Sequence, residues 1–311
     1  MKIVFMGTPE FAAEHLKALI KNGWNIVAAF SQPDRAKGRG KKVLPTPVKL
    51  VAQEYGIPVF QPASVNKGRG FETLSSLSPD VIITVAYGKL LKKNVIELPP
   101  LGCYNVHASI LPKYRGAAPI QRALEAGEKK TGISIFKIDE GMDSGPVAMI
   151  KEIDILPEDN FGTLSEKLCR LGCETLKEFM TNLSEGRVKL IPQNHENATY
   201  APKISKEDTI ISDFDDAKRI YNKIRAFDPV PGVSVKLGTK MIKLYGALFD
   251  DVTPEGKPGE IVSIGRKYMV VKCKEGVVMI SGIQFPGKKL ISPWQAKAGR
   301  LIKEGMILGG R

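Results

Sequence analysis

The sequence is poor in the residues that most often bind metals. Its 311 residues include only three histidines and four cysteines. Cys103, Cys169, Cys173 and Cys273 form no CxxC pair, and no ligand-like cluster of histidines accompanies them in the sequence. Cys169 and Cys173 lie four residues apart on an expected helix, where half of a metal site is conceivable, but buried free thiols are the preferred interpretation. We therefore expect no metal.

Long apolar runs are also missing. No run approaches the ~20 residues that a membrane helix needs. The opening residues, MKIVFMGTPEF, hold only a short apolar stretch before Gly7, Thr8 and Pro9. This pattern is typical of a strand and a turn rather than of a secretory signal peptide. We therefore expect a cytoplasmic protein without a membrane segment.

Glycine motifs that bind nucleotides are absent as well. The turn after the first expected strand, GTPEF, has one glycine where a dinucleotide-binding fold has G-x-G-x-x-G, and no P-loop occurs. A nucleotide cofactor is thus poorly supported. Some other ligand is expected where the strands end.

Negative charge is scarce, since the formal net charge is +13. Residues from 209 onward hold 18 Lys and Arg against 10 Asp and Glu, a surplus of 8. Such a basic segment favours a polyanionic partner, of which nucleic acid is the commonest. Charge alone fits a basic protein without such a partner about equally well.

The first part of the chain alternates strand and helix signals, as a parallel α/β sheet does. We expect strands at 2–7, 25–30, 80–88, 102–109 and 132–139, and helices at 11–23, 47–56, 118–127 and roughly 163–185. Thr163 and Glu166 predict a capping box for the last helix.

The alternation of strand and helix signals ends near residue 190. Residues 190–208 are polar and include two prolines, so we expect a linker between domains at 1–189 and 209–311. One helix is expected at 216–227. Short apolar runs separated by turn residues follow it, which suggests a small barrel or sandwich.

Asn105 and His107 share one face of an expected strand, because side chains at i and i+2 point the same way. Pro112 and Gly116 prevent the strand from continuing. Ligands of open α/β sheets collect at strand ends, where an amide and an imidazole can stabilise a carbonyl oxygen that becomes negative. On spacing alone, a satisfied core histidine beside a turn asparagine is the stronger interpretation.

Asp143 lies between Gly141 and Gly145, in the acidic loop EGMDSGP after the expected strand 132–139. If this strand neighbours the one that carries His107, the carboxylate can orient the imidazole and stabilise its charged form. The alternative is an acid in a surface turn.

The stretch DRAKGRGKKVLPTPVK is strongly basic. Such connections usually take only ~2–6 residues, and a longer basic loop near the strand ends could close over a phosphate backbone. Taken alone, a solvated mobile loop is slightly favoured. Its basic residues are Arg35, Lys37, Arg39, Lys41, Lys42 and Lys49.

The run NVHASILPKYRG, followed later by GMDSG, resembles the folate-dependent formyltransferases. The likeness is greatest to the members that act on initiator methionyl-tRNA. It extends over nearly the whole chain through segments such as FMGTPEFA, QPDRAKGRGKK, YRGAAPIQRAL and IRAFDPVPG.

The resemblance implies a Rossmann-like, mostly parallel catalytic domain followed by a small OB-like β-barrel domain that binds tRNA. Asn105 and His107 would hold the formyl oxygen of 10-formyltetrahydrofolate, while Asp143 would pair with His107 and assist removal of the amine proton. The folate-binding residues that it implies are Lys89, Leu91, Ser109, Pro112, Asp139, Glu140 and Gly141. The tRNA-binding residues that it implies are Arg35, Lys37, Arg39, Lys41 and Lys42. A monomer is expected.

Two alternatives remain at this point. One is a folate-dependent formyltransferase that acts on a small amine, for which the basic C-terminal part would be unnecessary. The other is a nucleic-acid-binding protein whose α/β part has lost its activity. The presence of Asn105, His107 and Asp143 together argues against this alternative.

Overall fold

The computed structural model describes residues 1–37 and 42–309, which form two compact units. The first unit comprises residues 1–119, 130–154 and 165–202. The second comprises residues 120–129, 155–164 and the chain from 203 onward. Within the described ranges, no helix is both long enough and apolar enough to cross a bilayer.

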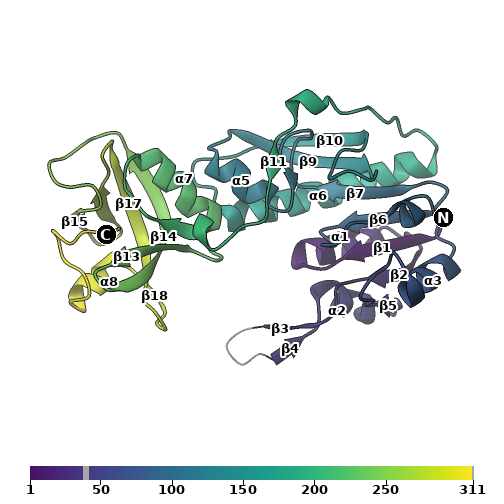
Figure 1. The fold of residues 1–311 in the computed structure, drawn as a ribbon, viewed down its shortest axis with the longest axis horizontal. Coiled ribbons are helices and arrows are strands. Elements are labelled where there is room, and N and C mark those ends of the chain that lie inside the picture. The colour runs from purple at the N-terminus through teal and green to yellow at the C-terminus, as the bar shows by residue number, and fades with distance from the viewer. Residues whose placement is uncertain (38–41, 310–311) are drawn as a thin grey trace. The chain divides into compact units, whose positions relative to one another are not determined.

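A seven-stranded sheet forms the centre of the first unit, in the order β10-β9-β7-β6-β1-β2-β5 (Figure 1). Its strands are β1 (Ile3–Gly7), β2 (Ile26–Phe30), β5 (Val59–Phe60), β6 (Val81–Val85), β7 (Cys103–His107), β9 (Lys130–Lys137) and β10 (Val147–Asp154). The five strands from β7 to β5 are parallel to one another. Strand β9 pairs antiparallel with β7, and β10 pairs antiparallel with β9. The mostly parallel α/β fold expected from the sequence is thereby confirmed.

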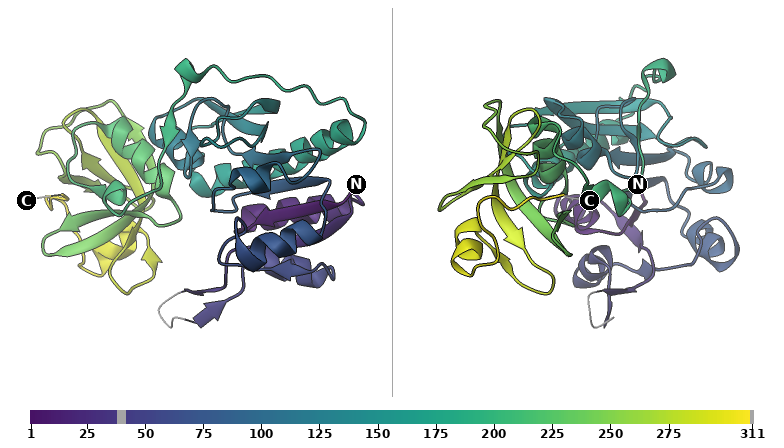
Figure 2. Two further views of the ribbon diagram at one scale, coloured as in Figure 1. Left: turned by 45° about the vertical axis from the view of Figure 1, so that its right-hand side comes forward. Right: turned by 60° about the vertical axis from the view of Figure 1, so that its left-hand side comes forward.

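The helices of this unit follow the expected α/β alternation. They are α1 (Glu10–Lys21), α2 (Pro47–Glu54), α3 (Gly68–Ser76), α4 (Lys93–Ile96) and α6 (Phe161–Ser184), the last beginning in the second unit. A hairpin of β3 (Arg35–Lys37) and β4 (Lys42–Leu44) projects from the unit (Figures 1 and 2). The short pair β8 (Arg115–Gly116) and β11 (Tyr200–Ala201) ties the segment near residue 200 to the unit.

The sequence did not predict β10 or α3. In β10 buried and exposed positions alternate and charged side chains interrupt the apolar pattern, because this strand lies at the edge of the sheet. In α3 two of the first three residues are Gly68 and Gly70, which have low intrinsic preference for a helix.

The start of α6 differs from the expected capping box. The Thr163 backbone N–H donates to Asn160 Oδ1 at 2.9 Å, and the Asn160 backbone N–H donates to Thr163 Oγ1 at 3.1 Å. Asn160 is therefore the capping residue, and Thr163 lies inside the first turn. The predicted pairing of Thr163 with Glu166 is wrong because the helix begins two residues earlier.

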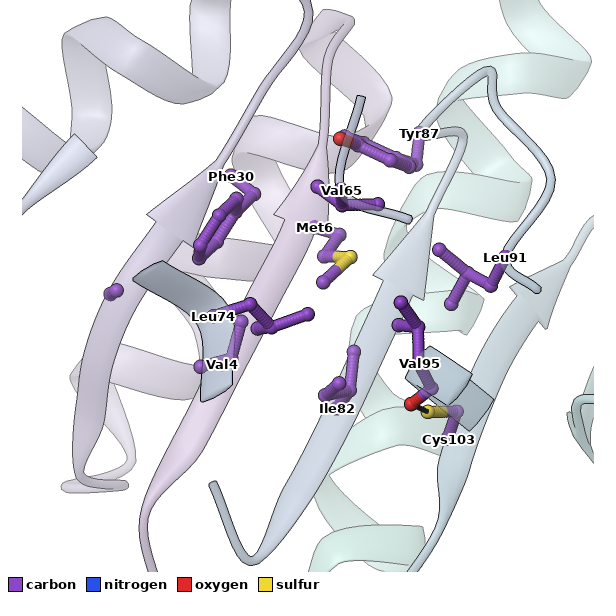
Figure 3. Packing of buried hydrophobic residues seen from close by; sticks show 11 residues of the cluster. Val4, Met6, Phe30, Val65, Leu74, Ile82, Tyr87, Leu91, Val95 and Cys103 are labelled. Carbon is purple, nitrogen blue, oxygen red and sulfur yellow. Dashed lines mark hydrogen bonds between the residues drawn. The ribbon is translucent and has the colours of Figure 1, made fainter. Parts of the chain in front are cut away.

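The apolar core on one face of the sheet is drawn in Figure 3. Val4 and Met6 of β1 alternate with residues that face the other side, and with Ile82 of β6 they have no exposed surface. Cys103 lies in the same cluster, where its thiol donates weakly to the Val95 carbonyl at 3.5 Å. Burial raises the pKa of Cys103 to about 12, as expected for an inert buried thiol. Helices α1 and α6 lie behind the strands in this view.

A second sheet, in the order β12-β13-β14-β17-β16-β15 with β18 beside β17, forms the second unit. Its strands are β12 (Ile210–Ile211), β13 (Val233–Leu237), β14 (Lys240–Asp250), β15 (Ile261–Ile264), β16 (Met269–Lys272), β17 (Val277–Gln284) and β18 (Leu290–Ile291). The helices are α5 (Pro119–Glu125), α7 (Ala217–Phe227) and α8 (Pro293–Ala298).

The C-terminal segment closes this sheet. Leu308 bridges Leu237 of β13, and Ile307 bridges Glu260, next to β15. Backbone hydrogen bonds of 2.8 Å run from the Leu308 N–H to Gly259 and from the Gly309 N–H to Lys236. The segment thereby links β13, near one side of the sheet, to the residues beside β15 at the other edge and closes the sheet into a small barrel. This agrees with the separate β domain expected from the sequence.

An ion pair holds α5 to the segment before β12 within the second unit. The Arg122 guanidinium donates to both carboxylate oxygens of Asp208, at 2.8 and 3.3 Å, and also to Glu125 at 2.8 Å. The hydrogen bonds from Arg122, followed by that from the Ser205 backbone N–H, lower the pKa of Asp208 to about 2. This carboxylate thus favours its charged form in the folded protein.

We expect Asp208→Asn to lower the free energy of unfolding at pH 7 by about 1 kcal/mol, because a partly exposed pair is screened by solvent. The pKa of Asp208 is lower in the folded chain than its ordinary value of 3.8. The stabilisation is therefore complete above about pH 4 and is lost as the pH falls toward about 2. Urea unfolding of both proteins across this range tests the prediction. A difference that stays constant with pH contradicts it.

Candidate functional site

The register of β7 places Asn105 and His107 on one face near the end of the strand. Asn105 lies opposite Phe136 and His107 opposite Ser134 of the neighbouring strand β9. Because β9 runs antiparallel to β7, the loop after β9 begins beside Cys103, where the Ile138 N–H donates to the Cys103 carbonyl at 2.8 Å. The loop then folds back, so that Asp143 reaches His107. The three predicted catalytic residues therefore come from one strand and one loop.

Both ring nitrogens of His107 face acceptors. Nε2 lies 2.9 Å from the Tyr114 carbonyl oxygen and must donate to it, because a carbonyl only accepts. Nδ1 lies 3.6 Å from Asp143 Oδ2, which is ion-pair range but too long for a hydrogen bond. The ring is 5% exposed and meets Phe136 edge-on. Since Nε2 carries the proton of the neutral ring, Nδ1 bears a proton only in the imidazolium form.

Asp143 is held in a backbone conformation that few residues with side chains adopt. Its φ is 50°, in the left-handed region. The Gly116 backbone N–H donates to Asp143 Oδ2 at 2.7 Å and orients the carboxylate. The side chain is only 19% exposed. Such a strained backbone is kept where surrounding contacts fix it, and it often marks a functional position.

The contacts that fix Asp143 come from two residues that the sequence analysis did not identify. Gln193 Nε2 donates to the backbone carbonyls of Asp143 and Gly145, at 2.9 and 2.7 Å. Arg115 Nη2 in turn donates to Gln193 Oε1 at 2.6 Å. Both side chains are buried, although Gln193 lies in the stretch expected to be a linker. No signal in the sequence distinguishes Gln193 from the neighbouring amides Asn194 and Asn197.

Asn105 is oriented by Thr84, another residue that the sequence analysis missed. Thr84 Oγ1 on the neighbouring strand β6 donates to Asn105 Oδ1 at 2.8 Å. Because the amide oxygen is engaged, the amide N–H groups are the part that can serve a ligand oxygen. A single threonine within the buried run VIITV is the signal that could have pointed to it.

A cleft of about 1020 Å³ lies beside the segment after β6. Its lining includes Lys89, Leu91 and Glu140, three of the residues that the resemblance assigned to folate. Asn66 shapes one wall, since its amide donates to the Leu90 carbonyl at 2.9 Å and accepts from the Lys92 N–H at 2.8 Å. The cleft is thus built from three chain segments and carries several ammonium groups.

The other predicted folate residues lie outside the lining of this cleft. Asp139 Oδ1 accepts from the Gly141 N–H at 3.0 Å and from Ser144 Oγ at 2.8 Å, so Asp139 and Gly141 shape the loop that carries Asp143. Ser109 and Pro112 follow β7. The Ser109 hydroxyl donates to the Lys113 carbonyl at 2.6 Å, which fixes this turn.

Three of the predicted tRNA-binding residues, Arg35, Lys37 and Lys42, belong to the strands of the β3–β4 hairpin, which projects from the first unit (Figure 2). Arg35 is exposed on β3, Lys37 ends that strand and Lys42 begins β4. Arg39 and Lys41 lie outside the described residues. Lys49, from the same basic stretch, instead forms an ion pair with Asp34, with 2.6 Å between Nζ and Oδ2.

Comparisons with known proteins identify the family of this chain. A family model described as formyl transferase matches residues 1–180, and a second, described as formyl transferase C-terminal domain, matches residues 203–301. The methionyl-tRNA formyltransferase of Kosmotoga olearia is 66% identical over 311 residues, with 100% of each chain covered. That of Thermotoga maritima is 50% identical, covering 98% of this chain and 97% of the relative.

A solved structure shows the same fold at low identity. HypX from Aquifex aeolicus, in complex with tetrahydrofolic acid, matches 96% of this chain and 46% of its own length. The TM-score is 0.64 and the sequence identity 19%.

Proposed function

This chain belongs to the formyl transferase family, and we propose that it transfers the formyl group of 10-formyltetrahydrofolate to the amino group of initiator methionyl-tRNA. The observation that carries the mechanism is the convergence of Asn105, His107 and Asp143 at the end of β7. Relatives named for this activity at 66% and 50% identity support the choice of substrate over a small amine.

In the proposed reaction the methionyl amine attacks the formyl carbon, and the carbonyl electrons move onto the formyl oxygen. The Asn105 amide, aligned by Thr84, donates to that oxygen. His107, in the imidazolium form, contributes its positive charge. Each donor to such an oxyanion is typically worth ~10²–10³ in rate. When the intermediate collapses, the bond to the folate nitrogen breaks and the formyl group remains on the methionine.

Asp143 has two parts in this proposal. Its carboxylate stabilises the His107 imidazolium at 3.6 Å. It also assists removal of the proton that the amine loses as the new carbon–nitrogen bond forms, and that proton passes to the departing folate nitrogen. The Gly116 N–H binds the carboxylate, and Gln193 binds the backbone carbonyl of Asp143. The carboxylate is therefore already placed to stabilise the imidazolium and to assist the proton transfer. General acid–base assistance of this kind contributes ~10²–10⁴.

The cleft lined by Lys89, Leu91 and Glu140 supports a place for the folate. Leu90, which is 70% exposed and lines the cleft next to the largely buried Leu91, offers an apolar surface for a flat ring. Lys92 and Lys93 also line the cleft, and their ammonium groups complement the carboxylates of the folate glutamate tail. Ser109, Pro112, Asp139 and Gly141 would complete the folate site through the turn and loop that they form.

We propose that the basic stretch around β3 and β4 contacts the tRNA phosphates together with the basic second unit. The residues of that stretch which we propose for these contacts are Arg35, Lys37, Arg39, Lys41 and Lys42. We propose a catalytic domain at 1–189, a linker at 190–208 and a tRNA-binding domain at 209–311. A cytoplasmic monomer completes the proposal, because aminoacylated tRNA is a cytoplasmic substrate and one chain supplies all the groups named here.

Formyl transfer should occur to charged initiator methionyl-tRNA and not to free methionine, because only the tRNA engages the basic surfaces. The measurement is product formation from 10-formyltetrahydrofolate with the two acceptors in parallel. Turnover of the folate without formylated tRNA would favour a small-amine substrate. No turnover with either acceptor would favour a non-catalytic nucleic-acid-binding protein.

The tRNA affinity should fall steeply with salt, because Lys and Arg release counterions from the phosphates that they contact. Replacing Arg35, Lys37 and Lys42 by glutamine should weaken binding and reduce the slope of log K against log salt by about one for each phosphate that is no longer neutralised. A charge-matched control replaces Lys21, Lys177 and Lys189, three exposed lysines elsewhere on the first unit. Equal slopes for the two triple variants would remove the hairpin from the interface.

A further inference from the structure

Outside the proposed formyl-transfer site, the fold brings together one histidine and two cysteines. His15 belongs to α1, and Cys169 and Cys173 belong to α6. One ligand atom from each residue can be chosen so that all three atoms lie within 4.8 Å of one another. From the sequence, half of a metal site at the two cysteines was conceivable, but buried free thiols were the preferred interpretation. The histidine lies far away along the chain, so only the packing of α1 beside α6 completes the set.

His15 has the environment of a metal-ligating histidine. The ring is fully buried, and its Nδ1 donates to the Phe11 carbonyl at 2.7 Å. This bond fixes the proton on Nδ1 and leaves a lone pair on Nε2. Metal-binding histidines typically donate their other ring N–H to a carbonyl or carboxylate in this way. Nε2 has no hydrogen-bond partner among the described residues, although a buried polar atom normally finds one.

The free nitrogen points at the surface of α6 that carries the thiols. A Cβ atom placed on Gly172 would lie 2.3 Å from His15 Nε2. Gly172 lies between Cys169 and Cys173 in the sequence, and those two residues share one side of the helix because they are four apart. The absence of a side chain at Gly172 therefore leaves the imidazole open to both thiols.

The two thiols differ chemically from the other cysteines of the chain. Both are free and partly exposed. A hydrogen bond from the Cys173 thiol, and then the nearby His15, lower the pKa of Cys169, while the same pairing raises the pKa of Cys173. Burial raises the pKa of both Cys103 and Cys273 to about 12. Both sulfurs are therefore available as ligands, and sulfur binds a metal as the thiolate.

We propose that His15, Cys169 and Cys173 bind one zinc ion, with a water molecule in the fourth position. Thiolate and imidazole ligands suit zinc and exclude the oxygen-loving Mg²⁺ and Ca²⁺. Zinc takes sulfur at ~2.3 Å and nitrogen at ~2.0 Å in a tetrahedral site. Binding would draw the three ligand atoms, now within 4.8 Å of one another, closer together and would release thiol protons to solvent.

The zinc has a structural role, because none of its ligands belongs to the proposed formyl-transfer site. It links α1 to α6, which lie on the same face of the sheet (Figure 3). The proposal reverses the expectation of no metal that followed from the sequence.

The test uses the full chain, reduced and stripped of metal, titrated with Zn²⁺ against a chromophoric zinc chelator. We expect one equivalent to bind, and His15→Gln, Cys169→Ser and Cys173→Ser each to weaken binding about 100-fold or more. Cys103→Ser controls for loss of a thiol and should bind as the wild type does. Zinc should also raise the Tm of the wild type and of Cys103→Ser, because the metal binds only the folded state.

Cobalt provides a readout that does not depend on folding stability. Co²⁺ in place of zinc should show the intense visible bands of a tetrahedral site and sulfur-to-cobalt charge transfer, both reduced in each ligand variant. Circular dichroism checks that each variant is folded. The proposal is overturned if the wild type binds no stoichiometric zinc, if the three variants bind it equally well, or if the cobalt spectrum lacks thiolate charge transfer.

Discussion

Replacing Asp143 by asparagine should lower kcat by about 10²–10⁴ and leave the affinity for tRNA nearly unchanged. The substitution keeps the shape of the side chain and an oxygen that can accept from the Gly116 N–H, which now lies 2.7 Å from the carboxylate. The Gln193 bonds involve backbone carbonyls and are not altered. What is lost is the negative charge beside His107 and the proton acceptor for the amine.

Single-turnover formylation and tRNA binding, measured on the same preparations, separate these effects. Glu152→Gln is the matched control, since it removes an exposed carboxylate from β10 and should retain full activity. A variant that loses tRNA affinity and kcat together would assign Asp143 a part in tRNA binding or in folding. A variant with unchanged kcat would remove the carboxylate from the mechanism.

Replacing Asn105 by alanine should lower kcat by about 10²–10³, because one donor to the oxyanion is removed. Asn105→Asp should be slower still, since a carboxylate in that place repels the negative oxygen. The KM for tRNA should change little in either variant, because this interaction strengthens only as charge develops. Steady-state kinetics with saturating folate measures both quantities.

Thr84→Val tests whether Thr84 only orients the Asn105 amide or contacts the substrate itself. Valine has nearly the shape of threonine but cannot donate to Asn105 Oδ1 as the hydroxyl does at 2.8 Å. The amide then rotates more freely, and the loss of one hydrogen bond should cost about tenfold in kcat. A loss as large as that of Asn105→Ala would mean that Thr84 itself contacts the substrate.

The sequence alone was enough for the local features of this protein. A strand repeats every two residues, so the pair Asn105 and His107 on one face followed from spacing. The apolar run of β6 and the glycine-flanked Asp143 were likewise visible in short windows. The change from α/β alternation to short β runs predicted the separate β domain, and the motif residues predicted the family.

Only the tertiary structure decided which distant residues meet. The direction of β9, and hence the return path of the Asp143 loop, depends on edge pairing that no short window encodes. Thr84, Gln193 and Arg115 are ordinary in the sequence and become specific only through contacts across the sheet and loops. His15 shows the same point, since a helix period predicts its buried face but not the two thiols that it meets. Local periodicity fixes orientation along a segment, whereas contacts between distant segments are decided by how the whole core packs.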